Sequence, residues 1–163
     1  MNNEHLQTII DLRHTLHRHP ELSLREHDTM ARLKDFLRQH TTLQVVERDG
    51  WFYAVKEGRD PSAPPIAFRA DMDALPIAEG IDLPYGSACD GVAHKCGHDG
   101  HSAALCGLAL ELERHAPERT VYLISRAPRR LDRAPSAAPP CCGRQASERS
   151  TPSTIWADTR RAP

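Results

Sequence analysis

An eight-residue segment in the middle of the chain is rich in side chains that bind metal ions. It holds three histidines, one cysteine and one aspartate, in the order His94-Lys95-Cys96-Gly97-His98-Asp99-Gly100-His101. A thiolate and an imidazole two positions apart, as in Cys96 and His98, suit a borderline or soft divalent metal. The glycines between these side chains permit a tight bend. The segment therefore indicates a metal-ligand loop, and the alternative is an ordinary polar loop before a helix.

Two carboxylates, Asp71 and Asp73, follow a short apolar run at residues 65–70. This run predicts a strand of the buried kind, so the carboxylates would emerge at its carboxyl end. In open α/β sheets that end is where ligands and catalytic groups collect. We therefore take both aspartates as candidate catalytic residues. For Asp73 an equal alternative is that it simply caps the loop, since Asp-x-Asp is also good turn chemistry.

Apolar spacing places these residues among helices and strands. It predicts helices over 6–19, stopped by Pro20, about 24–39 and 102–115. It also predicts strands at 45–46 and 51–55, joined by a turn at Asp49-Gly50, and at 65–70 and 120–124. Ser23 and Glu26 have the spacing of a capping box for the second helix, and the glycine-rich bend opens the third. The alternation of strand and helix from residue 51 onward predicts an α/β domain with a partly parallel sheet. Single histidines on helices, such as His17, are expected to be solvated or structural.

Size and composition restrict the class of protein. A chain of 163 residues can form one domain with a real core, and a net charge of -1 gives no general attraction to nucleic acid or anionic membranes. No apolar run has the length of a membrane span, and the polar N-terminus is no signal peptide, so we expect a cytoplasmic location without a membrane partner. Five irregularly spaced cysteines do not predict a disulfide framework.

The last part of the chain differs in composition. Residues 126–163 hold eight arginines, six prolines and seven alanines, and their large apolar residues are few. Such a segment cannot bury enough apolar surface to offset its chain entropy, so it predicts a disordered basic tail. Its arginines lack aromatic interleaving, and we therefore expect no nucleic-acid partner.

Three stretches together resemble the metal-dependent amidohydrolase family of hippurate hydrolases, indole-acetyl-amino-acid hydrolases and N-acetyldiaminopimelate deacetylases. These stretches are Leu-His-Arg-His-Pro-Glu-Leu-Ser at 16–23 with Glu26 and Thr29, Arg-Ala-Asp-Met-Asp-Ala-Leu-Pro at 69–76, and the segment 91–101. The resemblance covers about residues 6–125. It implies that residues 1–124 are the N-terminal part of a zinc-peptidase-like α/β/α catalytic domain, with an incomplete sheet and the lid and dimerisation domain absent.

The resemblance also implies an activity. Family members use two divalent ions, zinc or manganese, to cleave the amide bond of N-acyl amino acids through a metal-activated water. Carried over to this sequence, the metal ligands are Cys96 and His98, and the catalytic supporting carboxylate is Asp71. Asp73 could act beside it. His94 and His101 are expected to stabilise the loop instead of binding metal.

The resemblance ends at the last predicted strand. Family members continue there into Phe-Gln-Pro-Ala-Glu-Glu, which supplies the general base and a metal ligand, whereas residues 125–130 read Ser-Arg-Ala-Pro-Arg-Arg. Two later histidine ligands also have no counterpart. Glutamate codons read in a shifted frame after a cytosine become arginine codons, which leads to the hypothesis that residues 125–163 are an out-of-frame translation. The alternative to an active amidohydrolase is thus a catalytically inactive fragment, at most a weak metal-binding module.

Overall fold

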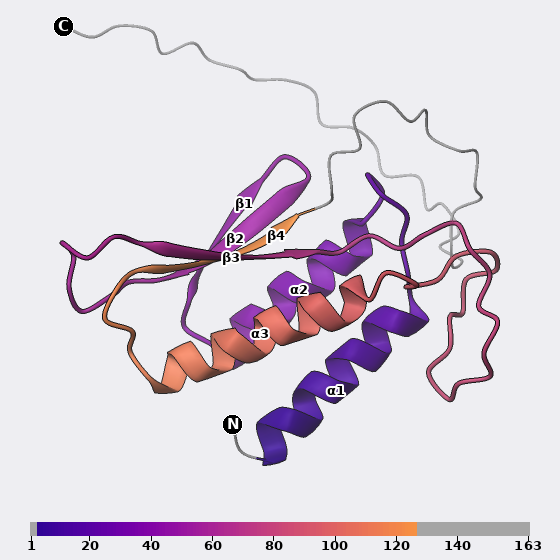
Figure 1. The fold of residues 1–163 in the computed structure, drawn as a ribbon, viewed down its shortest axis with the longest axis horizontal. Coiled ribbons are helices and arrows are strands. Elements are labelled where there is room, and N and C mark those ends of the chain that lie inside the picture. The colour runs from indigo at the N-terminus through magenta and orange to yellow at the C-terminus, as the bar shows by residue number, and fades with distance from the viewer. Residues whose placement is uncertain (1–2, 127–163) are drawn as a thin grey trace, which may run out of the picture.

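The computed structural model describes residues 3–126, which form a four-stranded sheet with helices against one face (Figure 1). The elements are α1 (Asn3–Arg18), α2 (His27–His40), β1 (Gln44–Arg48), β2 (Trp51–Lys56), β3 (Ile66–Asp71), α3 (His98–Arg114) and β4 (Val121–Arg126). The strand order is β1-β2-β4-β3, with β3 and β4 parallel and the other pairs antiparallel. The predicted α/β class and partly parallel sheet are confirmed. The basic tail and its proposed out-of-frame origin lie outside the described residues, except that Ser125 and Arg126 continue β4.

The first two strands form the predicted hairpin. Arg48 pairs with Trp51, so Asp49 and Gly50 alone make the loop. Gly50 has φ 72°, a left-handed conformation that costs a glycine little. The hairpin brings the apolar side of β2 against the helices, and Phe52 and Ala54 are fully buried there.

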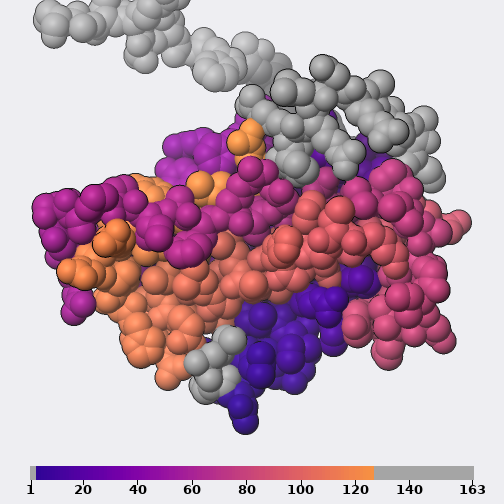
Figure 2. Space-filling view, viewed as in Figure 1, coloured from indigo at the N-terminus to yellow at the C-terminus, as the bar shows by residue number. Residues whose placement is uncertain are grey.

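The core lies between the sheet and the helices. Leu33 and Leu37 of α2 and Leu123 of β4 belong to one cluster of buried side chains, and each such side chain contributes about 1.5–3 kcal/mol on burial. Helix α1 packs along α3 through Leu12 and Leu16 and forms the indigo lower edge of the molecule in Figure 2. No helix within the described range is long and apolar enough to cross a membrane.

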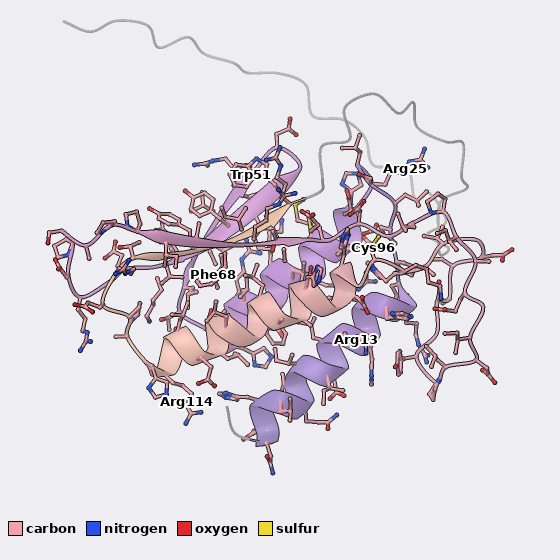
Figure 3. All side chains as sticks on the ribbon, in the orientation of Figure 1. Arg13, Arg25, Trp51, Phe68, Cys96 and Arg114 are labelled. Atoms are coloured by element: carbon pink, nitrogen blue, oxygen red, sulfur yellow. The ribbon has the colours of Figure 1, made fainter. Side chains whose placement is uncertain are left out.

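Strand β3 is not the buried strand that the sequence predicted. It lies at the edge of the sheet and pairs with β4 alone. Ile66 and Phe68 are 39% and 42% exposed, and Ala70 is its one buried residue (Figure 3 labels Phe68). A short apolar run is compatible with a central or an edge strand, because the local sequence does not specify how many neighbours the strand has.

Helix α2 begins at His27, about three residues later than predicted, and its cap differs from the predicted one. The carboxylate of Glu21 accepts hydrogen bonds from the backbone N–H groups of Asp28 at 3.2 Å and Thr29 at 2.6 Å. Glu26 occupies the N-cap position but makes no capping hydrogen bond with its side chain. The predicted capping box from Ser23 to Glu26 is therefore wrong, because a glutamate from the preceding turn satisfies these donors.

Candidate metal-binding site

His98 is the first residue of α3, four positions earlier than the predicted start of this helix. Gly97 precedes it with φ 79°, in the left-handed region that favours glycine, and so turns the chain into the helix. Nδ1 of His98 lies 2.8 Å from Oδ1 of Asp73 and 2.9 Å from the carbonyl oxygen of the same residue. If Nδ1 carries the proton and donates a hydrogen bond to Asp73, Nε2 of the ring keeps a lone pair for a metal ion.

The two candidate aspartates face different partners. Asp73 is 3% exposed and directed at His98. Asp71 instead accepts hydrogen bonds from Arg69, at 2.9 Å from Nε and 2.6 Å from Nη2. Strand β3 ends at Asp71, and the next residues are held by isolated bridges, from Ala74 to the linker before α2 and from Leu75 to Ala93. The structure thus brings Asp73, and not Asp71, to the candidate ligand His98.

The candidate ligand Cys96 has an exposed, free thiol immediately before Gly97 (Figure 3). The other two cysteines in the described part of the chain, Cys89 and Cys106, are buried. Burial raises the pKa of the Cys106 thiol to about 12, so this thiol stays protonated. Among these three, only Cys96 is accessible to a metal ion from solvent.

A partly buried network of polar and charged side chains connects this loop to α1. His17 is 6% exposed and lies between two carboxylates, with Nδ1 2.8 Å from Asp99 and Nε2 2.9 Å from Glu79. Arg13 also contacts Asp99, through Nε at 3.2 Å, and Lys95 forms an ion pair with Glu79. Because Asp99 follows His98 and Lys95 precedes Cys96, the network holds the segments on both sides of the candidate ligands.

The network also shifts the pKa values of its carboxyl groups. Burial acts to raise the pKa of Asp99, but the hydrogen bonds from His17 and from the backbone of Gly100 act against it, and the pKa is lowered. The hydrogen bonds from Lys95 and His17 lower the pKa of Glu79. Both groups are therefore carboxylates at neutral pH.

His94 is a buried imidazole at the centre of this region. It is 5% exposed, and its ring centroid lies 6.2 Å from that of His17. Neither ring nitrogen has a hydrogen-bond partner in the described part of the chain. Burial lowers the pKa of His94 to about 4, so the ring is neutral at pH 7. His101 is exposed, with its ring centroid 5.8 Å from that of His98. The backbone N–H of His101 donates to the carbonyl oxygen of Gly97, but within residues 3–126 the ring of neither histidine makes a hydrogen bond, so the loop-stabilising role of the two side chains stays a prediction.

The donor set fits part of a metal site. Catalytic zinc normally has three protein ligands and a water. Cys96 and His98 supply two donors of suitable type, and His98 has the carboxylate partner that ligating histidines usually have. Within residues 3–126, no group of three or more His, Cys, Asp or Glu side chains is arranged to hold a metal ion.

Sequence reasoning missed most of the network. A single histidine on a helix predicts a solvated or structural ring, and the ring of His17 is buried and structural. Arg13, Glu79, Lys95 and Asp99 were assigned no role. Their spacing gave no signal, because His17 and Asp99 are 82 positions apart and Glu79 stands in a loop without periodicity.

Comparison with known proteins finds one family model and several relatives that match this chain. Residues 67–126 match the model of peptidase family M20/M25/M40. The N-acetylcysteine deacetylase of Bacillus subtilis (strain 168) is 40% identical over 112 residues, which are 68% of this chain and 29% of that protein. An uncharacterised hydrolase of Staphylococcus aureus (strain bovine RF122 / ET3-1) is 46% identical over 100 residues, 61% of this chain and 26% of that protein.

Solved structures show the same relationship. A dinuclear metal-binding peptidase of the M20 family from Bacillus subtilis matches with a TM-score of 0.72 and 35% identity, over 76% of this chain and 36% of that chain. An aminohydrolase, so far assigned provisionally, from methicillin-resistant Staphylococcus aureus matches with a TM-score of 0.68 and 31% identity, over 78% and 34%. This chain spans about a third or less of each of these relatives. It belongs to the M20 family of peptidases and amidohydrolases and covers part of that family's usual length.

Proposed function

We propose that this chain carries the Cys-Gly-His part of the active site of a metal-dependent amidohydrolase that acts on N-acyl amino acids. The hydrogen bond between Nδ1 of His98 and Oδ1 of Asp73, at 2.8 Å, carries the proposal. A buried carboxylate that fixes the ring of a histidine at the start of a helix is the arrangement expected of a metal ligand. The relative named N-acetylcysteine deacetylase supports N-acetyl amino acids as the substrate class.

Each residue has a separate task in this proposal. Cys96, as a thiolate, and His98, through Nε2, would hold a divalent ion such as zinc or manganese. When bound, two such ions polarise an amide carbonyl and lower the pKa of a bound water. Asp73 keeps the proton on Nδ1 of His98 and fixes the orientation of the ring. In the net reaction water adds to the acyl carbon, the carbon–nitrogen bond breaks, and the amine leaves with a proton from water.

A second candidate function is metal binding without catalysis. The observation that favours it is the absence, within residues 3–126, of a third donor near Cys96 and His98. A two-donor site binds a metal ion more weakly and leaves the general base unassigned. The two candidates therefore differ in turnover, while both require metal binding.

The test uses the full 163-residue chain with added manganese or zinc. Release of amine from N-acetylcysteine, N-acetylmethionine and hippurate is measured beside metal binding by calorimetry. Turnover that is lost in Cys96→Ala but kept in His115→Ala, an exposed histidine, would support the amidohydrolase. Metal binding that depends on Cys96 without turnover would support the second function, and the absence of metal binding would overturn both.

A further inference from the structure

A cavity of about 490 Å³ lies between the start of α2 and the β1–β2 hairpin. The helix side of the cavity is lined by Leu24, Glu26 and Met30, and the hairpin side by residues 47–50. Met72, which follows β3, also lines it. The candidate metal ligands are not among its lining residues. The cavity is therefore a separate site, and its chemistry has to follow from its own side chains.

Glu26 lines this cavity and has one carboxyl oxygen without a partner. Glu26 is 6% exposed, and its Oε1 has no hydrogen-bond partner within residues 3–126, although the backbone at Leu24 and Glu26 donates to the carboxyl group. Glu26 stands at the N-cap of α2, but Glu21 already occupies the helix donors that it would otherwise cap. Buried carboxyl oxygens nearly always have a hydrogen-bond donor. The unpartnered oxygen thus points to a donor that a bound molecule would supply.

The charges around Glu26 favour a cation as that donor. The pKa of Glu26 is raised to about 7. Burial is the main cause and the charges of Asp73 and Glu21 add to it, while hydrogen bonds from the backbone act in the opposite direction. A positive charge beside Oε1 would be attracted by three carboxyl groups at once, whereas an anion would be repelled.

The rim of the cavity carries charges of both signs. Glu47 and Asp49 are acidic, while Arg48 and His27 are basic. Glu47 is 52% exposed and directed at Lys34, with 2.7 Å between Oε1 and Nζ. The rim charges are thus nearly balanced. The net negative charge of the cavity lies deeper, at the carboxyl group of Glu26.

The remaining lining is apolar and adaptable. Leu24 is 73% exposed and has φ 67°, a left-handed conformation that is uncommon for a branched side chain. Met30 and Met72 are flexible thioethers that fit ligands of varied shape. An exposed leucine at the entrance and two methionines inside match a short aliphatic chain.

We propose that this cavity binds a primary alkylammonium group, with the ammonium donating to Oε1 of Glu26 and the alkyl chain lying against Leu24, Met30 and Met72. The natural ligand would thus be an aliphatic amine, free or at the end of a side chain. Binding does not involve Cys96 or His98, so this proposal can fail while the proposed hydrolase function stands, although the charge of Asp73 acts at both sites.

Calorimetry of the full chain with n-butylammonium, in the presence of EDTA, tests the site apart from any metal. n-Butanol and butyrate serve as neutral and anionic ligands of similar length. We expect butylammonium to bind at least tenfold more tightly than either of these ligands. The substitution Glu26→Gln should weaken the affinity for butylammonium at least tenfold. The matched control Glu47→Gln, on the exposed rim, should change it less than threefold.

A pH series on the unaltered chain gives a second measurement that needs no variant. Ionisation of a carboxyl group with a pKa of about 7 should tighten butylammonium binding about tenfold from pH 6 to pH 8. Equal affinity for butanol would show a merely apolar cavity. That result would overturn the proposal. So would an unchanged affinity of Glu26→Gln for butylammonium, an affinity that does not depend on pH, or the absence of binding at millimolar amine.

Discussion

Nδ1 of His17 lies 2.8 Å from Oδ2 of Asp99, and this buried contact joins the last turn of α1 to the first turn of α3. Asp99 is 1% exposed and follows the candidate ligand His98 directly. Nε2 of the same imidazole contacts Glu79, in the loop that leads to Cys96. A single ring in α1 therefore positions both sides of the candidate metal site.

Replacing His17 by alanine should destabilise the fold by about 3 kcal/mol, because it removes the buried ring whose two nitrogens contact the carboxylates of Asp99 and Glu79. Urea unfolding of the full chain measures this. His115→Ala is the matched control, since His115 is 75% exposed and lies 3.9 Å from Glu111, and it should change stability by less than about 0.5 kcal/mol. A loss for His17→Ala no larger than that of the control would contradict the structural role.

Replacing Asp73 by asparagine should weaken zinc binding about 10–100-fold, as loss of a carboxylate behind a ligating histidine does. Asp71→Asn is the matched control, because Asp71 contacts Arg69 and not His98. We expect it to change zinc affinity less than about threefold. Calorimetric titration with zinc compares the two variants. A larger loss of zinc affinity in Asp71→Asn than in Asp73→Asn would contradict this expectation and support Asp71 as the supporting carboxylate that the family resemblance implies.

The titration of Glu26 should make part of the stability depend on pH. Its pKa is raised from 4.5 to about 7 in the folded chain, so the folded state binds more protons than the unfolded state between these values. This contribution is fully present below pH 4.5 and is lost as the pH rises through 7. The stability difference between the unaltered chain and Glu26→Gln should therefore grow by about 2 kcal/mol from pH 7 to pH 5.

Urea unfolding at both pH values, without added amine, measures this difference. Taking the difference between the two proteins removes the contributions of other titrating groups that the substitution leaves unchanged. A constant difference between pH 7 and pH 5 would contradict the raised pKa, because it would show that Glu26 stays ionised in the folded chain at both pH values. A difference that shrinks as the pH falls would have the wrong sign.

Gly58 should not tolerate a side chain. A Cβ atom there would lie 2.5 Å from the backbone nitrogen of Thr120 and would also overlap the carbonyl carbon of Arg119. Gly58→Ala should cost about 1–3 kcal/mol through this overlap with the backbone before β4. Gly80 has nothing within 4 Å of such an atom, and Gly80→Ala should be nearly neutral. Thermal unfolding distinguishes the two, and equal melting temperatures would contradict the close approach.

The cysteines of the described residues should differ in reactivity. Iodoacetamide should modify the exposed Cys96 in the folded chain, whereas the buried Cys89 and Cys106 should react only after unfolding. Peptide mass spectrometry resolves the individual sites. Zinc should protect Cys96 if its thiolate is a ligand. Modification of Cys96 at the same rate with and without zinc would count against this assignment.

Several features followed from the sequence because their causes are local. The two-residue loop at Asp49-Gly50, the bend at Gly97 and the helix ended by Pro20 depend on residues within a few positions of one another. The Cys-Gly-His segment at the start of α3 was likewise recognisable, because its ligand types are adjacent in the chain. Such local patterns can be interpreted without knowing which helices and strands pack against one another.

Tertiary structure decided the remaining features, because they depend on contacts between distant residues. Spacing alone does not reveal the position of β3 at the sheet edge, the cap supplied by Glu21, or the contact of His98 with Asp73 instead of Asp71. The clearest case is His17, which as a sequence feature was one histidine on a helix. Packing of α1 against α3 removes it from water and places it between two carboxylates, and this turns it into a buried connection within the site.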